Sequence, residues 1–176
     1  MIVVEGPDGA GKTSLVEKLI KDLEIPLAPK AVGGDAHALV PLRKYVDDTL
    51  DAGFRRMLYD RHALISEPIY SSGLTKMRPA KGFDDYRWVS TAYSRWRDLA
   101  PLVIICLPPF DEVWKNCQRD EHNKRLFPTK YRLAAIYWLY FNLAARNPAY
   151  MIYDYTKDQY GMVLDFLIHS LEMRQV

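Results

Sequence analysis

Residues 2–15, IVVEGPDGAGKTSL, carry the strongest indication of fold class in this sequence. It opens with a β-branched apolar run that is typical of a buried strand, and a glycine-rich turn follows directly. Over residues 12–24 apolar side chains recur every three or four positions, which predicts one buried face of a helix. The turn itself, residues 6–13, fits the pattern G-x-x-x-x-G-K-[ST]. A strand, this turn and a helix in that order predict the start of an α/β fold.

The glycine-rich turn predicts a phosphate-binding loop. Small residues allow backbone N–H groups to point inward around a phosphate chain, and the following helix presents its positive end. We expect Lys12 to reach the β- and γ-phosphates of a nucleotide and the Thr13 hydroxyl to bind Mg²⁺. The loop residues expected to contact ATP are Gly6, Asp8, Gly9, Ala10, Gly11, Lys12, Thr13 and Ser14.

Beyond the first helix, short apolar runs alternate with helical patterns. Further strands are predicted at residues 27–32, 55–59, 102–107 and 150–153, and helices at 41–52, 63–74, 84–100, 110–120, 131–146 and 157–173. This alternation predicts the three-layer α/β/α architecture of a P-loop NTPase, with a parallel five-stranded sheet. At 176 residues the chain has the length of one domain, so we expect residues 1–176 to form a single P-loop domain.

The composition restricts the kind of partner. Twenty-four basic and 22 acidic residues give a net charge of +2, which is too balanced for nonspecific nucleic-acid binding by bulk charge. The two cysteines cannot form a disulfide framework, and reduced thiols favour a cytoplasmic location. The longest aliphatic run, residues 102–107, is far shorter than a membrane span, and the first residues lack the pattern of a signal peptide. We therefore expect no membrane partner and an anion site that is built locally.

Two motifs together resemble a known family. EGPDGAGKT at residues 5–13 resembles the phosphate loop of thymidylate kinases and their viral relatives. Asp60-Arg61-His62, followed by Ser66-Glu67 and Tyr70, is similar to the Asp-Arg-[Tyr/His] motif after the third strand of that family. The order of elements agrees over nearly the whole chain. The resemblance implies a (deoxy)nucleoside monophosphate kinase that uses ATP and Mg²⁺, and that family is usually dimeric.

The resemblance also implies roles for individual residues. Asp8 matches the carboxylate that holds the 3′-hydroxyl of the acceptor sugar, Arg61 matches the arginine that grips the acceptor phosphate, and Asp60 matches a residue near Mg²⁺. Tyr70 matches an aromatic against the acceptor sugar or base, and the loop at Tyr155 would line the adenine of ATP. The residues agree with these roles, because ligands gather at the carboxyl ends of parallel strands and a planar guanidinium binds phosphate well.

A segment of about residues 117–132 is expected to form a helical lid. It is rich in basic side chains, and in the resembling family an arginine-bearing lid closes at this place. Some thymidylate kinases carry an arginine directly after the loop aspartate, where this chain has Gly9. The lid should therefore supply the catalytic cations, and Arg119 and Arg125 are the best candidates. The alternative is a solvated, charged helix end.

Three functions stay open, and two of them differ in the acceptor of the phosphoryl group. A nucleoside hydroxyl needs a carboxylate base, and deoxynucleoside kinases, which also resemble this chain, carry a glutamate at the end of their second strand. Residues 27–34 contain no acidic residue, and Asp35 is the nearest. This favours a deoxynucleoside monophosphate, thymidylate or a modified analogue of it. The alternatives are a deoxynucleoside kinase and a non-catalytic module that binds nucleotides or nucleic-acid ends.

Several other residues are interpreted as structural. His62 is expected to be a hydrogen-bonded structural histidine. The aromatics Trp88, Tyr93 and Trp96 could stack on a base, but this spacing is more typical of core. Residues 133–145 are almost wholly apolar, which predicts a helix buried on all sides, either in the core or at a homodimer face.

Overall fold

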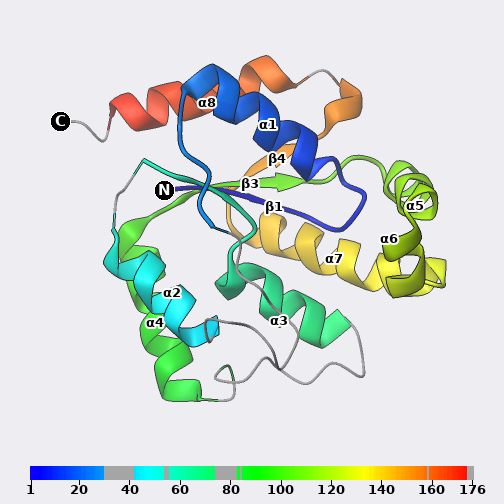
Figure 1. The fold of residues 1–176 in the computed structure, drawn as a ribbon, viewed down its shortest axis with the longest axis horizontal. Coiled ribbons are helices and arrows are strands. Elements are labelled where there is room, and N and C mark those ends of the chain that lie inside the picture. The colour runs from blue at the N-terminus through cyan, green and yellow to red at the C-terminus, as the bar shows by residue number, and fades with distance from the viewer. Residues whose placement is uncertain (30–41, 54–55, 74–82, 84, 158, 174–176) are drawn as a thin grey trace.

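The computed structural model of the protein describes residues 1–29, 42–53, 56–73, 83, 85–157 and 159–173, and its sheet is parallel throughout (Figure 1). The strands are β1 (Ile2–Glu5), β2 (Leu58–Asp60), β3 (Leu102–Cys106) and β4 (Met151–Tyr153). They lie in the order β2-β1-β3-β4, so β1 is central and the segment that leaves it reaches the carboxyl edge of the sheet. This confirms the prediction of an α/β fold around a parallel sheet.

The expected fifth strand is wrong for the residues that the structure describes, which form four. Beside β2, Leu27 makes an isolated parallel bridge with Leu58 instead of a strand. Two hydrogen bonds hold it, from the Ala28 N–H to the Leu58 carbonyl (2.8 Å) and from the Leu58 N–H to the Pro26 carbonyl (3.0 Å). Prolines at 26 and 29 have no N–H to donate, which limits a ladder here. Residues 30–32 of the predicted strand lie outside the described part.

Helices cover both faces of the sheet. They are α1 (Lys12–Leu23), α2 (Leu42–Asp51), α3 (Ala63–Gly73), α4 (Tyr86–Leu99), α5 (Phe110–Arg119), α6 (Glu121–Leu126), α7 (Lys130–Arg146) and α8 (Tyr160–Glu172), with a 3₁₀ turn at Tyr155–Lys157. In Figure 1, α1 and α8 lie on one side of the strands and α3 and α7 on the other. Helix α6 falls in a stretch that the sequence pattern left unassigned, because its charged residues show no apolar periodicity.

The core is built on the two central strands. Val3, Val4, Ile104 and Ile105 are fully buried, as expected for strands covered on both faces. Trp88 and Trp96 are also buried, so their interpretation as core is confirmed.

Helix α7 differs from its predicted burial. One side of it is buried, whereas Trp138 is 55% exposed and Phe141 is 42% exposed on the outer side. The interpretation of α7 as a helix buried in the core is therefore wrong for its outer side, because large aromatics occupy surface positions there, and the homodimer face stays a prediction. Within the described residues, no helix is both long and apolar enough to span a membrane.

Candidate active site

The glycine-rich loop runs from the end of β1 to the beginning of α1. Gly11 is the N-cap of α1 and has φ of 80°, a left-handed conformation that favours glycine. No side chain caps this helix end, so its first N–H groups are available to a phosphate. Thr13 and Ser14 are exposed beside them. The loop thus has the geometry of a phosphate-binding loop.

Lys12 lies buried at the centre of the loop. Its Nζ donates a hydrogen bond to the Pro7 carbonyl at 2.7 Å and lies 4.0 Å from an Asp8 carboxylate oxygen. Burial, together with the nearby Arg61 charge, lowers the pKa of Lys12 to about 8. An anion brought next to this ammonium group would favour its charged form.

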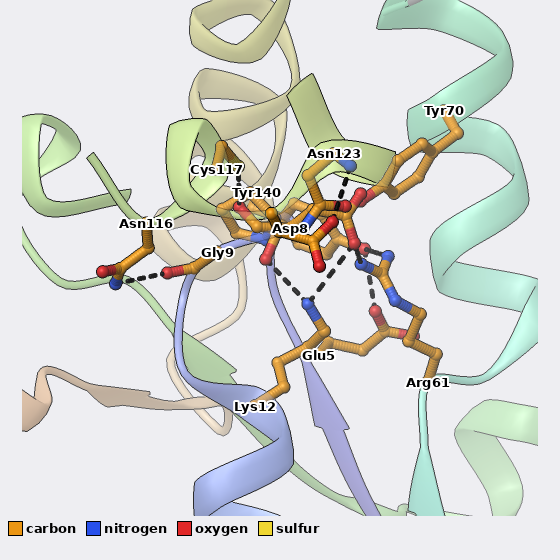
Figure 2. Close-up of polar contacts among 12 residues, drawn as sticks. Glu5, Asp8, Gly9, Lys12, Arg61, Tyr70, Asn116, Cys117, Asn123 and Tyr140 are labelled. Atoms are coloured by element: carbon orange, nitrogen blue, oxygen red, sulfur yellow. Dashed lines mark hydrogen bonds and ion pairs between the residues drawn. The ribbon is translucent and has the colours of Figure 1, made fainter. Parts of the chain in front are cut away.

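One side of the loop is held by α5 and by the turn after β4. The Asn116 side chain donates both to the Gly9 carbonyl at 3.0 Å and to the Tyr155 hydroxyl at 2.9 Å. The Cys117 thiol donates to the Asp8 carbonyl at 3.0 Å (Figure 2). The Tyr155 ring packs against Gly11, where a Cβ would come within 3.0 Å of the ring. Tyr155 is one of the residues predicted to contact ATP, whereas Asn116 belongs to no sequence motif and was not predicted.

The other side of the loop carries a cluster of charged and phenolic groups. Asp8 accepts hydrogen bonds from Arg61 at 2.5 Å and from the Tyr70 hydroxyl at 2.7 Å (Figure 2). The Arg61 guanidinium also lies over the Tyr70 ring, 4.8 Å from its centroid. The structure therefore brings together three residues that the sequence predicted to contact the acceptor.

Charge within this cluster is fixed by its neighbours. Burial alone would raise the pKa of Asp8, but the positive charges of Arg61 and Lys12 and the Tyr70 hydrogen bond lower it below its ordinary value. Burial likewise acts to lower the pKa of Arg61, yet the surrounding oxygens raise it well above the ordinary value. Asp8 is consequently an ionised, weakly basic carboxylate, and Arg61 is a permanent cation.

Beneath the cluster lies the carboxylate of Glu5, the first residue of the loop motif, for which no separate role was predicted. Glu5 is 0% exposed and accepts hydrogen bonds from the Tyr140 hydroxyl at 2.8 Å and from the His62 N–H at 2.7 Å. Tyr140 in turn accepts from Arg61 at 3.3 Å. The sequence does contain a sign that Glu5 is unusual, because it is a charged residue at the end of an otherwise apolar strand. No such sign marks Tyr140, because its neighbours in the predicted helix are mostly apolar.

His62 is a neutral structural residue, as predicted. Its ring is fully buried, and burial lowers its pKa to about 3. The Leu64 N–H donates to Nδ1 at 3.3 Å, so Nε2 carries the proton and donates to the Thr49 hydroxyl at 2.9 Å. These bonds secure the backbone directly after Arg61.

The predicted lid arginines are not part of the cluster. Arg119 and Arg125 are exposed, and neither forms a hydrogen bond or ion pair with a residue that the structure describes. They lie at the end of α5 and in α6, and Asp120 between these helices caps α6 by accepting from the Asn123 N–H. Helix α6 packs against α5, whose Cys117 thiol donates to the Asp8 carbonyl, so α6 lies on the same side of the molecule as the loop.

The residues present fit ATP with Mg²⁺. The exposed Thr13 hydroxyl, the uncapped helix end and Lys12 surround one loop, and Asp60 ends β2 in register with Val4. No group of three or more His, Cys, Asp and Glu side chains suited to a metal occurs among the described residues. A magnesium ion here would be held through Thr13 and Asp60 and mainly by phosphate oxygens and water, which is its usual preference with nucleotides.

Comparison with known proteins gives similarity in structure only. Neither a protein-family model nor a curated protein matches the sequence. A deoxyadenosine kinase from M. mycoides with bound dATP is 14% identical, with a TM-score of 0.61, covering 94% of this chain and 98% of that chain. Its structure with bound dCTP is 16% identical, with a TM-score of 0.60, covering 96% and 100%.

A second protein extends the likeness. The YorR protein from Bacillus subtilis, in complex with phosphorylated GDP, is 16% identical, with a TM-score of 0.68, covering 99% of this chain and 96% of that chain. At such identities the similarity establishes the fold, and the resemblance to thymidylate kinases stays a prediction. The chain has the α/β fold of these nucleotide-binding proteins, including a deoxynucleoside kinase, over nearly its whole length.

Proposed function

We propose that the protein transfers the γ-phosphoryl group of ATP to a deoxynucleoside 5′-monophosphate, thymidylate or a modified analogue of it. The observation that carries this proposal is the Asp8–Arg61 pair beside Lys12. Arg61 lies 2.5 Å from Asp8, and Asp8 lies 4.0 Å from the phosphate-loop lysine. The permanent cation Arg61 and the carboxylate of Asp8 therefore lie beside the lysine that would bind ATP, where a second nucleotide would approach the γ-phosphate.

A monophosphate acceptor suits the chemistry of this cluster. Its phosphate is already an anion, so it requires a cation to hold it rather than a base to deprotonate it. Arg61 supplies that cation with a side chain that is still 24% exposed. Asp8, with its lowered pKa, is a poor base but a good acceptor for a sugar hydroxyl, and Tyr70 beside it would lie against the sugar or base.

The donor side is proposed to bind ATP with Mg²⁺. Bound magnesium neutralises phosphate charge and orients the γ-phosphoryl group for in-line transfer. Lys12 would contact the β- and γ-phosphates from its buried position, and Thr13 and Asp60 would hold the ion. Tyr155, fixed by Asn116, would border the adenine.

The segment from Cys117 to Arg132 is proposed to act as the lid of a single kinase domain. It includes α6, which packs against α5 beside the loop, and its exposed Arg119 and Arg125 would move onto the transferring phosphoryl group when the lid closes. Closure would also exclude water, which strengthens every charge interaction in the site.

A deoxynucleoside kinase is the second candidate. The structural likeness to deoxyadenosine kinase favours it, and the segment that would carry its base, with Asp35, lies outside the described residues. In that reading the 5′-hydroxyl of a nucleoside, not a phosphate, would face the donor.

A panel of acceptors separates these functions. The purified protein is incubated with MgATP and each deoxynucleoside or its 5′-monophosphate, and ADP release and the products are quantified by chromatography and mass spectrometry. We expect diphosphates from monophosphates and no product from Lys12→Ala. Phosphorylation of nucleosides alone would replace the proposal by the second candidate. No transfer to any acceptor would indicate a non-catalytic nucleotide-binding module.

A further inference from the structure

We infer that Glu5 is a positioning residue for the acceptor site, which holds Arg61 in place through Tyr140 and through the His62 peptide. This inference rests on the proposed role of Arg61 in binding the acceptor phosphate. Glu5 itself touches neither substrate in this arrangement, because its side chain is 0% exposed beneath the loop.

A directed chain of hydrogen bonds links Glu5 to the guanidinium. Arg61 Nη1 donates to the Tyr140 hydroxyl oxygen at 3.3 Å, and the Tyr140 hydroxyl donates to Glu5 Oε2 at 2.8 Å (Figure 2). The other guanidinium nitrogen, Nη2, donates to Asp8 at 2.5 Å. Hydrogen bonds thus hold the guanidinium at two points, and only one of them, at Asp8, belongs to the surface that would meet the substrate.

The second link runs through the backbone. Arg61 has φ of 73°, a left-handed conformation that costs free energy in a residue with a side chain. The next peptide N–H, at His62, donates to Glu5 Oε1 at 2.7 Å, and the Arg61 N–H donates to the Val4 carbonyl at 3.0 Å. The end of β1 therefore holds the strained turn from both sides, and Glu5 provides one of the two bonds.

The charge of Glu5 is part of this role. Both carboxylate oxygens accept donated hydrogens, which is the pattern of an ionised carboxylate, although burial raises the pKa of Glu5. A buried carboxylate persists only when it is paired and hydrogen-bonded. Glu5 and Asp8 together balance the buried charges of Lys12 and Arg61, so a phosphate would enter a site that is already close to neutral.

Two substitutions test the side-chain link separately. Tyr140→Phe removes the hydroxyl and keeps the ring. Glu5→Gln keeps an oxygen for the His62 N–H but presents an amino group to Tyr140, so Tyr140 can no longer donate to it. We expect each variant to raise the KM for the monophosphate about tenfold, as for loss of a hydrogen bond to a charged group, with the KM for ATP unchanged within about twofold.

The double variant Glu5→Gln/Tyr140→Phe tests whether the two residues act in one chain. If they do, it raises the monophosphate KM no further than the larger single effect. A product of the two effects, about a hundredfold, would overturn the inference, because Glu5 would then act independently of Tyr140.

Tyr137→Phe is the matched control. Tyr137 lies on the same helix and is also buried, but its hydroxyl donates to the Pro108 carbonyl at 3.0 Å, away from Arg61. It should change thermal stability about as much as Tyr140→Phe and leave the monophosphate KM unaltered. Equal changes in the monophosphate KM of the two tyrosine variants would show that Tyr140 has only a structural role, and would overturn the inference. This comparison stands even where Glu5→Gln does not fold.

A spectroscopic readout keeps the inference separate from the proposed function. The Nε–H resonance of Arg61, assigned by its loss in Arg61→Lys, should shift in Tyr140→Phe and Glu5→Gln but not in Tyr137→Phe. An unshifted resonance in both variants overturns the inference whatever the activity. The proposed function fails instead when the unaltered protein phosphorylates no monophosphate.

Discussion

The two sides of the phosphate loop are built by different means. On the side of α5, Asn116 and Cys117 meet backbone carbonyls of the loop, and Gly9 lies so close that an added Cβ would be 2.7 Å from the Val113 carbonyl. On the side of β2, the contacts to the loop are made by ionised and phenolic side chains, with Arg61 and Tyr70 both bonded to Asp8. Lys12 lies between the two sides.

This difference separates two tasks. The α5 side depends on shape and backbone geometry, which suits the phosphate chain common to all nucleoside triphosphates. The β2 side depends on charge and hydroxyl placement, which suits discrimination among acceptors. Substitutions on the two sides should accordingly change different kinetic constants, the KM for the monophosphate on the β2 side and the KM for ATP on the α5 side.

The largest effect is expected from Asp8→Ala. It removes the carboxylate proposed to accept from the sugar hydroxyl and leaves Arg61 without its ion pair, so the KM for the monophosphate should rise about a hundredfold, equivalent to about 2.7 kcal/mol. The KM for ATP should change by less than about threefold. Steady-state kinetics with each substrate varied in turn measures both, and equal losses would show that the two sides are not separate.

Gly9→Ala should disrupt the α5 side. The new Cβ would come within 2.7 Å of the Val113 carbonyl and 2.8 Å of the Cys117 sulfur, at a φ of 80°. We expect a loss of about 2 kcal/mol in the free energy of unfolding from overpacking and strain, with weaker ATP binding. The control is Gly53→Ala, at φ of 61° with nothing within 4 Å of the new Cβ. Urea unfolding of both variants separates the effect of the clash from that of the left-handed backbone. Equal losses in the free energy of unfolding would contradict a clash at Gly9.

Acidification should loosen the β2 side through His62. Burial lowers the pKa of His62 to about 3, whereas in the unfolded chain it is about 6.5. The unfolded state therefore binds the additional proton between these values, and stability that is complete above pH 6.5 declines as the pH falls toward 3. Between pH 6.5 and 5 the loss attributable to this residue is about 2 kcal/mol. Urea unfolding at several pH values should give a shallower decline for His62→Gln, and parallel curves would refute the assignment.

The smallest effect is expected from Asn116→Ala. It removes the bonds to the Gly9 carbonyl and to Tyr155, so the KM for ATP should rise about fivefold, equivalent to about 1 kcal/mol, with the monophosphate KM unchanged. Asn147→Ala removes a comparable amide, which donates to the Leu143 carbonyl in α7, and serves as the control. A rise in the monophosphate KM of Asn116→Ala would show that the α5 side also positions the acceptor.

Most of the element order follows from local sequence. Local pattern alone predicts β1 and β3, which are apolar runs, and α1 and α8, whose apolar residues have helical spacing. The exceptions are elements whose residues carry no local signal. The fifth strand was expected within a loop-like stretch at residues 27–32, and prolines at 26 and 29 restrict its ladder. Helix α6 is short and charged, and α7 was assigned full burial because aromatic side chains do not reveal which of them reach the surface.

The phosphate loop is predictable from local sequence, because its residues are contiguous and their chemistry is set by spacing alone. The motifs also pointed to Asp8, Arg61 and Tyr70 as candidates. Which groups meet became visible in the folded chain alone, since the Tyr140–Glu5 bond joins residues 135 positions apart and the Asn116–Gly9 bond joins residues 107 apart. No local pattern encodes such pairs, because they depend on how parallel strands and their helices bring distant segments to one edge of the sheet.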